Sequence, residues 1–447
     1  MARSVAVRSG GRVAGISTPS ASGWDWLLLF TAGYLVMAVA RVHVFYPPLT
    51  RIRPTLIVAG FALLVYVLDR SRIRSIGLGH PLVRLTGFLI FWATFTAPFG
   101  LYLGGSVQFL FDELYKVGLL FLLLAAAVRN TQDVRRLIVV YVYGCAALGA
   151  YVLVSPRNFV GGYDPNDVAM VLVSALPLAI HLLLGARAAV DKLPLLLSLS
   201  ICITGVVVTE SRGGFVSLAA AVVFSLFFFR GIKRFWRIAT VVGVAGLIGI
   251  AAGQAYWSEM RSLVSLDEDY NVTSFTGRKQ IWLRGIGYMA ANPLTGVGID
   301  NFKAAEGQHP VVQQRQRQGR GTKWSVAHSA WVQVGAELGL PGLLSFLALF
   351  GVAAKGLYRI RQNRARRRVP VSVPDASALA EALLGALFAV AVGISFLSQA
   401  YGYALWALLG LVMGLFKVVR ANALLVAPGT GSGPRAGRGG WQFAPQR

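Results

Sequence analysis

Long apolar segments recur along almost the whole of this chain, each close to the ~17–25 residues that cross a bilayer as a helix. Only 14% of the 447 residues are charged, against about 25% in a soluble domain. Because backbone inside a membrane must satisfy its own hydrogen bonds, these runs predict helices rather than a β-barrel. We therefore expect an all-α polytopic membrane protein with about twelve transmembrane helices, or about eleven to thirteen because several runs are short. The expected spans are 24–42, 55–69, 83–103, 113–128, 136–154, 168–186, 193–210, 214–230, 237–253, 340–355, 379–398 and 402–419.

Positive charge is concentrated in alternate short loops, which predicts an orientation. The basic loops are 70–84, 129–136, 187–192, 230–237 and 355–368. The positive-inside rule places such loops in the cytoplasm and the intervening loops outside. The first outer loop breaks the pattern because it carries Arg41, Arg51 and Arg53. The net charge of +25 is explained by this topology and by contact with anionic membrane lipids, so we expect no nucleic-acid partner.

The spans and the loop charges together predict the domain organisation. No small-residue cleavage site is evident with the first apolar run, so we expect an uncleaved first helix. Cys145 and Cys202 both fall inside spans and indicate neither a disulfide framework nor a metal site. The expected parts are a cytoplasmic N-terminal segment (1–23), transmembrane helices one to nine (24–253), a large periplasmic loop with amphipathic helices (254–327), transmembrane helices ten to twelve (328–420) and a disordered cytoplasmic tail (421–447).

Arg212 lies in a very short outer turn between two apolar runs. An arginine at such a depth is costly unless it pairs or faces water. One interpretation is that Arg212 simply pairs with Glu210 or with a headgroup phosphate. The other is a phosphate clamp, because a planar guanidinium matches phosphate oxygens in a bidentate way. Gly213 and Gly214, which follow, would let backbone or ligand approach closely.

Arg278 opens an apparently amphipathic helix in the long outer loop, and that helix ends at Asn292-Pro293. Lying flat on the membrane, the helix would hold Arg278 near the level of the lipid headgroups. An ordinary interfacial anchor would have the same pattern. The later pair Gly296-Val297-Gly298 is too short a signal for a nucleotide site.

His328 follows a basic stretch that includes Arg320 and Lys323, and it begins the next apolar helix. A lone histidine at a helix start is more often structural than catalytic. Two arginines on the same expected face favour a role as general base, since imidazole titrates near pH ~6.5. The other histidines form no pair at metal-ligand spacing, so we expect chemistry without a metal or another cofactor.

The pattern His328-Ser329-x9-Gly339-x-x-Gly342 resembles the motif of the bacterial O-antigen ligase and polymerase superfamily, which also includes the protein O-oligosaccharyltransferases. The resemblance covers roughly residues 150–420, and the first four spans match only in general character. Supporting segments similar to that family are Asp164-Pro165-Asn166, Arg212-Gly213-Gly214, Gly277-Arg278-x-x-x-Trp282 and Asn292-Pro293-Leu294-x-Gly296-x-Gly298.

This resemblance implies an inverting glycosyltransferase of the GT-C type in the bacterial inner membrane, with its active site facing the periplasm. The implied donor is O-antigen on undecaprenyl diphosphate, and the implied acceptor is a sugar hydroxyl of lipid A–core. Arg212 and Arg278 would then bind the donor diphosphate and stabilise the charge that builds on it. His328 would accept the proton of the attacking hydroxyl or orient that hydroxyl. Arg320 and Lys323 are weaker candidates for holding acceptor phosphates.

Three other functions remain open. Within the family, a polymerase would use a second lipid-linked repeat as acceptor, and a protein ligase would use a serine or threonine hydroxyl. The very basic loop after residue 310 favours the phosphorylated lipid A–core. Outside the family, a transporter of lipid-linked glycan would have ionisable residues buried in mid-span, discontinuous helices and repeat symmetry. Glu113 and Lys116 are the main indication of that kind.

Overall fold

The computed structural model describes residues 23–69, 77–155, 160–261, 274–319, 324–365, 373 and 375–426. Within these ranges every regular element is a helix, and the single β-bridge pairs Val160 with Tyr163. Each of the expected spans overlaps one of the helices. The predicted class, an all-α membrane protein, is confirmed. The exact number of crossings stays a prediction.

The described residues contain eight helices that are long and apolar enough to cross a membrane, and shorter apolar helices accompany them. The eight are Pro81–Phe99 (α5 and η3), Thr131–Val154 (α8), Pro165–Gly185 (α9), Ala189–Val208 (α10), Arg234–Ala251 (α12), Ala330–Gln362 in α18 (Ala330–Ala365), Ala376–Ile394 (α19) and Tyr403–Asn422 in α20 (Tyr403–Val426). The shorter apolar helices are Trp26–Ala40 (α1 and η1), Pro54–Leu68 (α3) and Arg212–Phe228 (α11). Leu103–Phe109 (α6), Leu110–Leu114 (η4) and Tyr115–Ala127 (α7) follow one another without a break.

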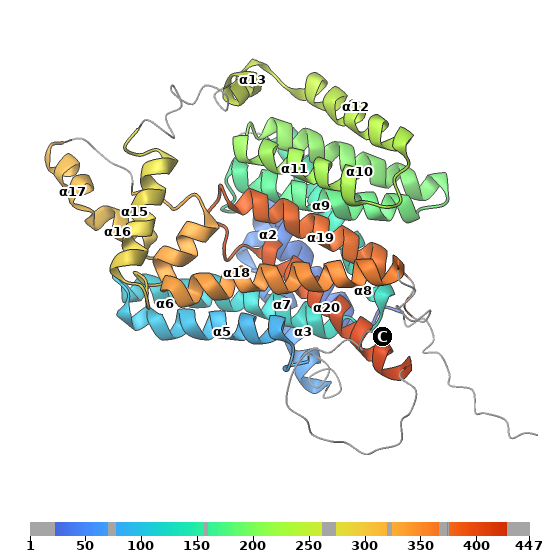
Figure 1. The fold of residues 1–447 in the computed structure, drawn as a ribbon, viewed down its shortest axis with the longest axis horizontal. Coiled ribbons are helices and arrows are strands. Elements are labelled where there is room, and N and C mark those ends of the chain that lie inside the picture. The colour runs from blue at the N-terminus through green and yellow to red at the C-terminus, as the bar shows by residue number, and fades with distance from the viewer. Residues whose placement is uncertain are drawn as a thin grey trace, which may run out of the picture.

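The bundle is built around α20, which packs against α7, α19, α8 and α18. Between Tyr403 and Phe416 its residues are apolar or aromatic on every side, as expected of a helix surrounded by other helices. Trp406 is completely buried there, and its indole N–H donates to the carbonyl of Ala400 at 3.1 Å. At the edge of the bundle (Figure 1), α12 has no buried residue and packs mainly on α10. Such an apolar but unburied helix fits contact with lipid.

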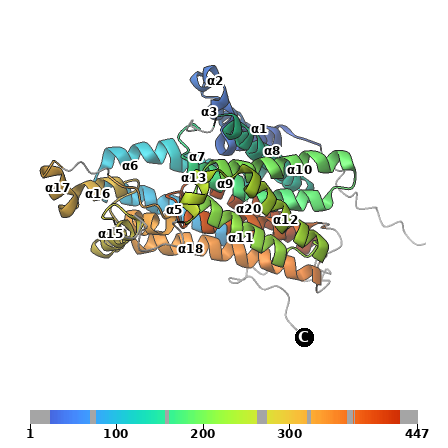
Figure 2. The same ribbon diagram turned by 90° about the horizontal axis from the view of Figure 1, so that it is seen from above.

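The described part of the segment expected to lie outside contains four short helices, of which the first packs against α10, α11 and α12 and the other three lie beside the start of α18 (Figure 1 and Figure 2). These are Gln254–Arg261 (α13), Arg278–Ala291 (α15), Phe302–Gln308 (α16) and Pro310–Arg317 (α17). Arg284 of α15 forms two hydrogen bonds of 2.7 and 2.6 Å with the carboxylate of Glu306, and Tyr288 donates to the same carboxylate at 2.8 Å. Burial is the largest single effect on the pKa of the Arg284 guanidinium and lowers it, but the hydrogen bonds and charge interactions with Glu306 and Tyr288 together exceed it, so the pKa is raised. This buried pair joins α15 to α16.

Helix α18 is interrupted at Gly339, where φ is 67° and ψ is −167°. This conformation is strained for any residue with a Cβ, and a Cβ here would also lie 2.5 Å from the carbonyl oxygen of Leu294. Pro341 cannot donate to the carbonyl of Glu337, so that oxygen needs another partner. Gly298 supplies it, with an N–H···O distance of 3.0 Å.

The segment after α15 covers the rest of this break. The N–H of Val297 donates to the carbonyl of Ala336 at 2.8 Å, and the N–H of Leu340 donates to that of Pro293 at 2.7 Å. The indole of Trp92 donates to the carbonyl of Leu338 at 3.0 Å. The two glycine- and proline-containing motifs of the sequence therefore pack on each other, and they lock the outer loop to the start of α18.

At the other end of the bundle, two of the basic loops meet. The N–H of Arg230 donates to Glu381 at 2.6 Å, and Arg361 donates to the carbonyl of Phe228 at 2.6 Å while pairing with Glu381 at 3.9 Å. These contacts and a 3.1 Å hydrogen bond from Arg230 to the carbonyl of Arg361 tie the start of the 230–237 loop to the described part of the 355–368 segment, in the last turns of α18. Two basic loops that were placed on one side by charge alone are thus in contact.

Candidate active site

Arg212 is the first residue of α11, where Ser211 caps the helix by accepting from the N–H of Gly214 at 2.9 Å. Its side chain is 10% exposed, and its Nε lies 3.3 Å from a carboxylate oxygen of Glu259. Glu259 belongs to α13 in the long outer segment and is half exposed. The sequence suggested Glu210 or a headgroup as the partner of Arg212. One partner in the structure, Glu259, lies 47 residues further along the chain (259 − 212).

Gly214, three residues after the cap Ser211, allows the close approach of another segment that was expected at this turn. A Cβ on Gly214 would lie 2.5 Å from the Cβ of Ala169 in α9. Glycine therefore allows the start of α11 to sit directly against the start of α9. The hydroxyl of Ser211 reaches the side-chain oxygen of Asn166 in α9 at 2.7 Å.

The start of α9 is held by a reciprocal capping box. Asp164 accepts from the N–H of Asp167 at 2.9 Å, and Asp167 accepts from the N–H of Asp164 at 3.2 Å. Pro165 occupies the first helical position, where a missing N–H costs nothing. The Asp164-Pro165-Asn166-Asp167 turn is thus a rigid platform that presents Asn166 to Ser211. On its other side, Asp167 accepts from the amide of Gln399 at 2.8 Å.

His328 lies just before α18 and has a left-handed backbone, with φ of 49°. For a residue other than glycine this conformation costs about 1–3 kcal/mol, and it is concentrated at functional sites. The N–H of His328 donates to the hydroxyl of Ser398 at 2.8 Å. The indole of Trp331, one turn into α18, donates to Ser395 at 2.9 Å. The loop between α19 and α20 therefore holds the start of α18.

These contacts form one continuous chain from Arg212 to His328. Ser211 binds Asn166, Asp167 binds Gln399, and Ser398 binds the backbone of His328. Residues more than 100 positions apart in sequence thus meet at one end of the bundle. The outer loops that charge placed on one side do lie together.

Arg278 is the first residue of α15 and is half buried. One turn later, the indole of Trp282 donates to the carbonyl of Ala327 at 3.0 Å. Side chains four positions apart lie on one face of a helix, so Arg278 shares the face that contacts the residue before His328. The Gly277-Arg278-x-x-x-Trp282 motif is thereby attached to the His328 motif.

The structure therefore joins the loops that carry the three predicted residues, and it adds partners that the sequence did not single out as site residues. Glu259, Gln399 and Ser398 have no local pattern that could have revealed them. The expected acceptor-binding residues Arg320 and Lys323 lie outside the described residues.

No group of three or more histidine, cysteine or acidic side chains in the described ranges could hold a metal ion. The expectation of metal-free chemistry remains a prediction. What the site does offer is two permanent guanidinium charges and one imidazole, all borne by loops that contact one another. Such a set can stabilise a phosphate leaving group and accept a proton.

In a comparison with known families, residues 197–347 match the model described as O-antigen ligase. The matched region contains Arg212, Arg278 and His328 and ends five residues after Gly342 (347 − 342). No curated protein sequence matches the chain.

Proposed function

Because the match over residues 197–347 makes this chain a member of the O-antigen ligase and polymerase superfamily, we propose that it is an O-antigen ligase. In this proposal the protein lies in the bacterial inner membrane as an inverting GT-C glycosyltransferase with its site open to the periplasm. It moves a glycan from undecaprenyl diphosphate to a sugar hydroxyl of lipid A–core. The observation that carries the proposal is the hydrogen-bonded chain between the Arg212 and His328 loops, with Arg278 attached through Trp282.

The reaction assigned to this site is a single displacement. The acceptor hydroxyl attacks the anomeric carbon, a new C–O bond forms, and the bond from that carbon to the diphosphate oxygen breaks with inversion. The proton of the hydroxyl passes to the imidazole of His328. Arg212 and Arg278 hold the diphosphate and stabilise the negative charge it gains on leaving. No metal takes part in this scheme.

Arg212 is well placed for the leaving group because one of its partners, Glu259, is exposed enough to exchange with a ligand. Glu259 is half exposed and comes from a separate short helix, so it can yield to a ligand without unfolding the bundle. The acceptor phosphates would be held by Arg320 and Lys323 in the basic part of the outer loop.

Transfer by the purified protein in detergent tests this proposal, with undecaprenyl-diphosphate glycan as donor and lipid A–core as acceptor. Wild type is expected to give product, and His328→Ala none. Lengthened glycan on the lipid carrier, without product on lipid A–core, would make the protein a polymerase. Transfer to a peptide serine or threonine would make it a protein ligase.

A transporter of lipid-linked glycan is the second candidate, because two observations favour it. Helix α18 is interrupted at Gly339, and Glu337 beside the break is 1% exposed. Both features occur at the binding sites of transporters. Glu113 and Lys116, in contrast, line an open cavity, so they are not the buried mid-span charges that a transporter would need. Movement of labelled donor across vesicles, unchanged in His328→Ala, would favour this function over the ligase.

A further inference from the structure

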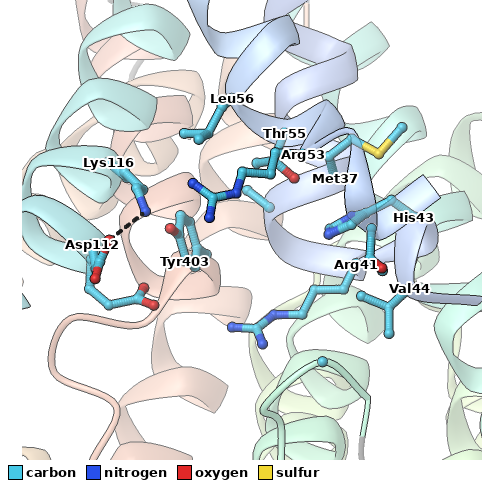
Figure 3. Close-up of a pocket in the computed structure, with 14 residues that line it drawn as sticks. Met37, Arg41, His43, Val44, Arg53, Thr55, Leu56, Asp112, Lys116 and Tyr403 are labelled. Atoms are coloured by element: carbon cyan, nitrogen blue, oxygen red, sulfur yellow. Dashed lines mark hydrogen bonds and ion pairs between the residues drawn. The ribbon is translucent and has the colours of Figure 1, made fainter. Parts of the chain in front are cut away.

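A polar cavity of about 320 Å³ is lined in part by Gly161, in the turn that leads into α9. It is formed where the connection between α1 and α3 faces the η4 turn and the first residue of α20 (Figure 3). Its polar lining includes Arg41, His43, Arg53, Asp112, Glu113, Lys116 and Tyr403. Its volume is within the range of small-molecule sites.

Two arginines form one wall of this cavity. Arg41 and Arg53 both have left-handed backbones, with φ of 51° and 48°. Such conformations cost free energy and persist where a function or the surrounding structure requires them. In Figure 3 both side chains extend from the N-terminal helices into the space beside Tyr403. Within the described part of the chain, neither arginine forms an ion pair with a carboxylate.

The position of Arg41 is fixed by its neighbours. Its guanidinium lies 3.8 Å from the centroid of the Tyr163 ring, a cation–π contact. A Cβ on Gly162 would lie 3.2 Å from the Nη1 of Arg41, so the loop before α9 is shaped around this side chain. Tyr163 directly precedes the Asp164 cap of α9. The cavity is therefore connected to the candidate active site through one rigid turn.

The opposite wall carries acids and a hydroxyl. Asp112 and Glu113 come from the π-helical turn η4, and Asp112 pairs with Lys116 at 3.5 Å. Tyr403 lies between the two walls (Figure 3). The cavity thus has guanidinium donors on one side and carboxylate and hydroxyl acceptors on the other. Guanidinium groups recognise phosphate, whereas carboxylates accept hydrogen bonds from sugar hydroxyls.

The cavity also borders a surface suited to lipid. Leu56 lines the cavity and is 44% exposed, and Ile57, Phe61 and Leu64 of the same helix are also exposed. The three arginines of the 41–53 segment are the ones that break the positive-inside pattern. A role in binding an anion explains why positive charge is retained there.

We propose that this cavity binds the phosphorylated sugar headgroup of a membrane lipid, at a site separate from Arg212 and Arg278. Arg41 and Arg53 bind the phosphate, and Asp112, Glu113 and Tyr403 accept hydrogen bonds from the sugar hydroxyls. Two lipids share this chemistry, a phosphorylated glycolipid acceptor and the lipid-linked donor. Which of them binds rests on the proposed function, whereas the headgroup chemistry rests on the cavity alone.

Binding without turnover tests the site. The full-length protein is placed in phosphatidylcholine nanodiscs and titrated with lipid A–core or with undecaprenyl-diphosphate glycan. Arg53→Gln is the main variant, because Arg53 is exposed and its loss leaves no packing defect. Arg51→Gln is the matched control, since Arg51 is exposed in the same segment but does not line the cavity.

We expect Arg53→Gln to weaken binding of one of these lipids by about tenfold or more. The double variant, which carries both Arg41→Gln and Arg53→Gln, should bind that lipid roughly tenfold more weakly still. Arg51→Gln should bind as wild type does. Loss for lipid A–core identifies an acceptor site, and loss for the donor lipid that adds to the loss caused by Arg212→Gln identifies a second donor contact. Dephosphorylated lipid A–core should bind the wild type and Arg53→Gln equally weakly.

Three results would overturn the proposal. One is unchanged binding of both lipids in the double variant. Another is a loss in Arg51→Gln as large as in Arg53→Gln, which would indicate surface charge only. The third is an equal loss for phosphatidylglycerol, which carries a phosphate but no sugar. Because no turnover is measured, weakened binding by a protein that fails to transfer glycan would support this site and reject only the proposed function.

Discussion

At the residue scale, the site depends on the kind of cation as well as on its charge. Arg212 is nearly buried and borders the turn where α9 and α11 meet. Lysine keeps the charge but cannot make the paired hydrogen bonds of a guanidinium. We therefore expect Arg212→Lys to lower kcat/KM for transfer by about 10- to 100-fold, with normal amounts of folded protein. Initial rates in detergent measure this, and a loss below about twofold would show that charge alone suffices.

Glu259 gives a second test at the same scale. Its carboxylate forms an ion pair with Arg212, with an oxygen 3.3 Å from the Nε of the guanidinium. A donor diphosphate must compete with that carboxylate, because both use the same guanidinium. Glu259→Gln should therefore lower the KM for donor while kcat stays within about a factor of two. An increase in KM would mean that Glu259 positions Arg212 for binding.

At the element scale, the break in α18 decides how the His328 helix meets the outer loop. Gly339 is required there by its positive φ and by the nearby carbonyl of Leu294. We expect Gly339→Ala to destabilise the protein by at least about 1–2 kcal/mol, visible as a lower melting temperature in detergent. Gly351→Ala, further along α18, is the control. Its added Cβ would meet nothing within 4 Å, so stability should be unchanged or slightly higher. Equal effects of the two variants would contradict a special role for the break.

At the scale of the whole molecule, the topology can be tested by chemical labelling. Cys145 and Cys202 are buried in the bundle, which leaves a low background. Thr276→Cys in the outer segment and Lys233→Cys in a basic loop both replace exposed residues. With a maleimide that cannot cross the inner membrane, we expect Thr276→Cys to be labelled in cells whose outer membrane is permeabilised. Lys233→Cys should be labelled only after the inner membrane is broken, and the reverse result would invert the proposed orientation.

The expected spans overlap the helices, but their edges differ. The span expected at 340–355 belongs to a helix that begins at Ala330, because the stretch around Gln333 and Glu337 is too polar for a hydropathy pattern to include. Tertiary contacts hold that stretch in the bundle, since Trp331 bonds to Ser395 and Tyr401 lies 3.4 Å from Glu337. The segments 1–22 and 427–447 lie outside the described residues.

The sequence by itself determined the class of the protein, the alternation of basic loops and the residues chemically able to handle phosphate and protons. Apolar length and loop charge are local properties, and a bilayer acts on each segment separately. Only the tertiary structure decided that Arg212 meets Glu259, that Gln399 and Ser398 connect the Arg212 and His328 loops, and that Arg41 and Arg53 line a common cavity. Those contacts join residues far apart in the chain, and helix packing across the whole bundle, rather than any local pattern, brings them together.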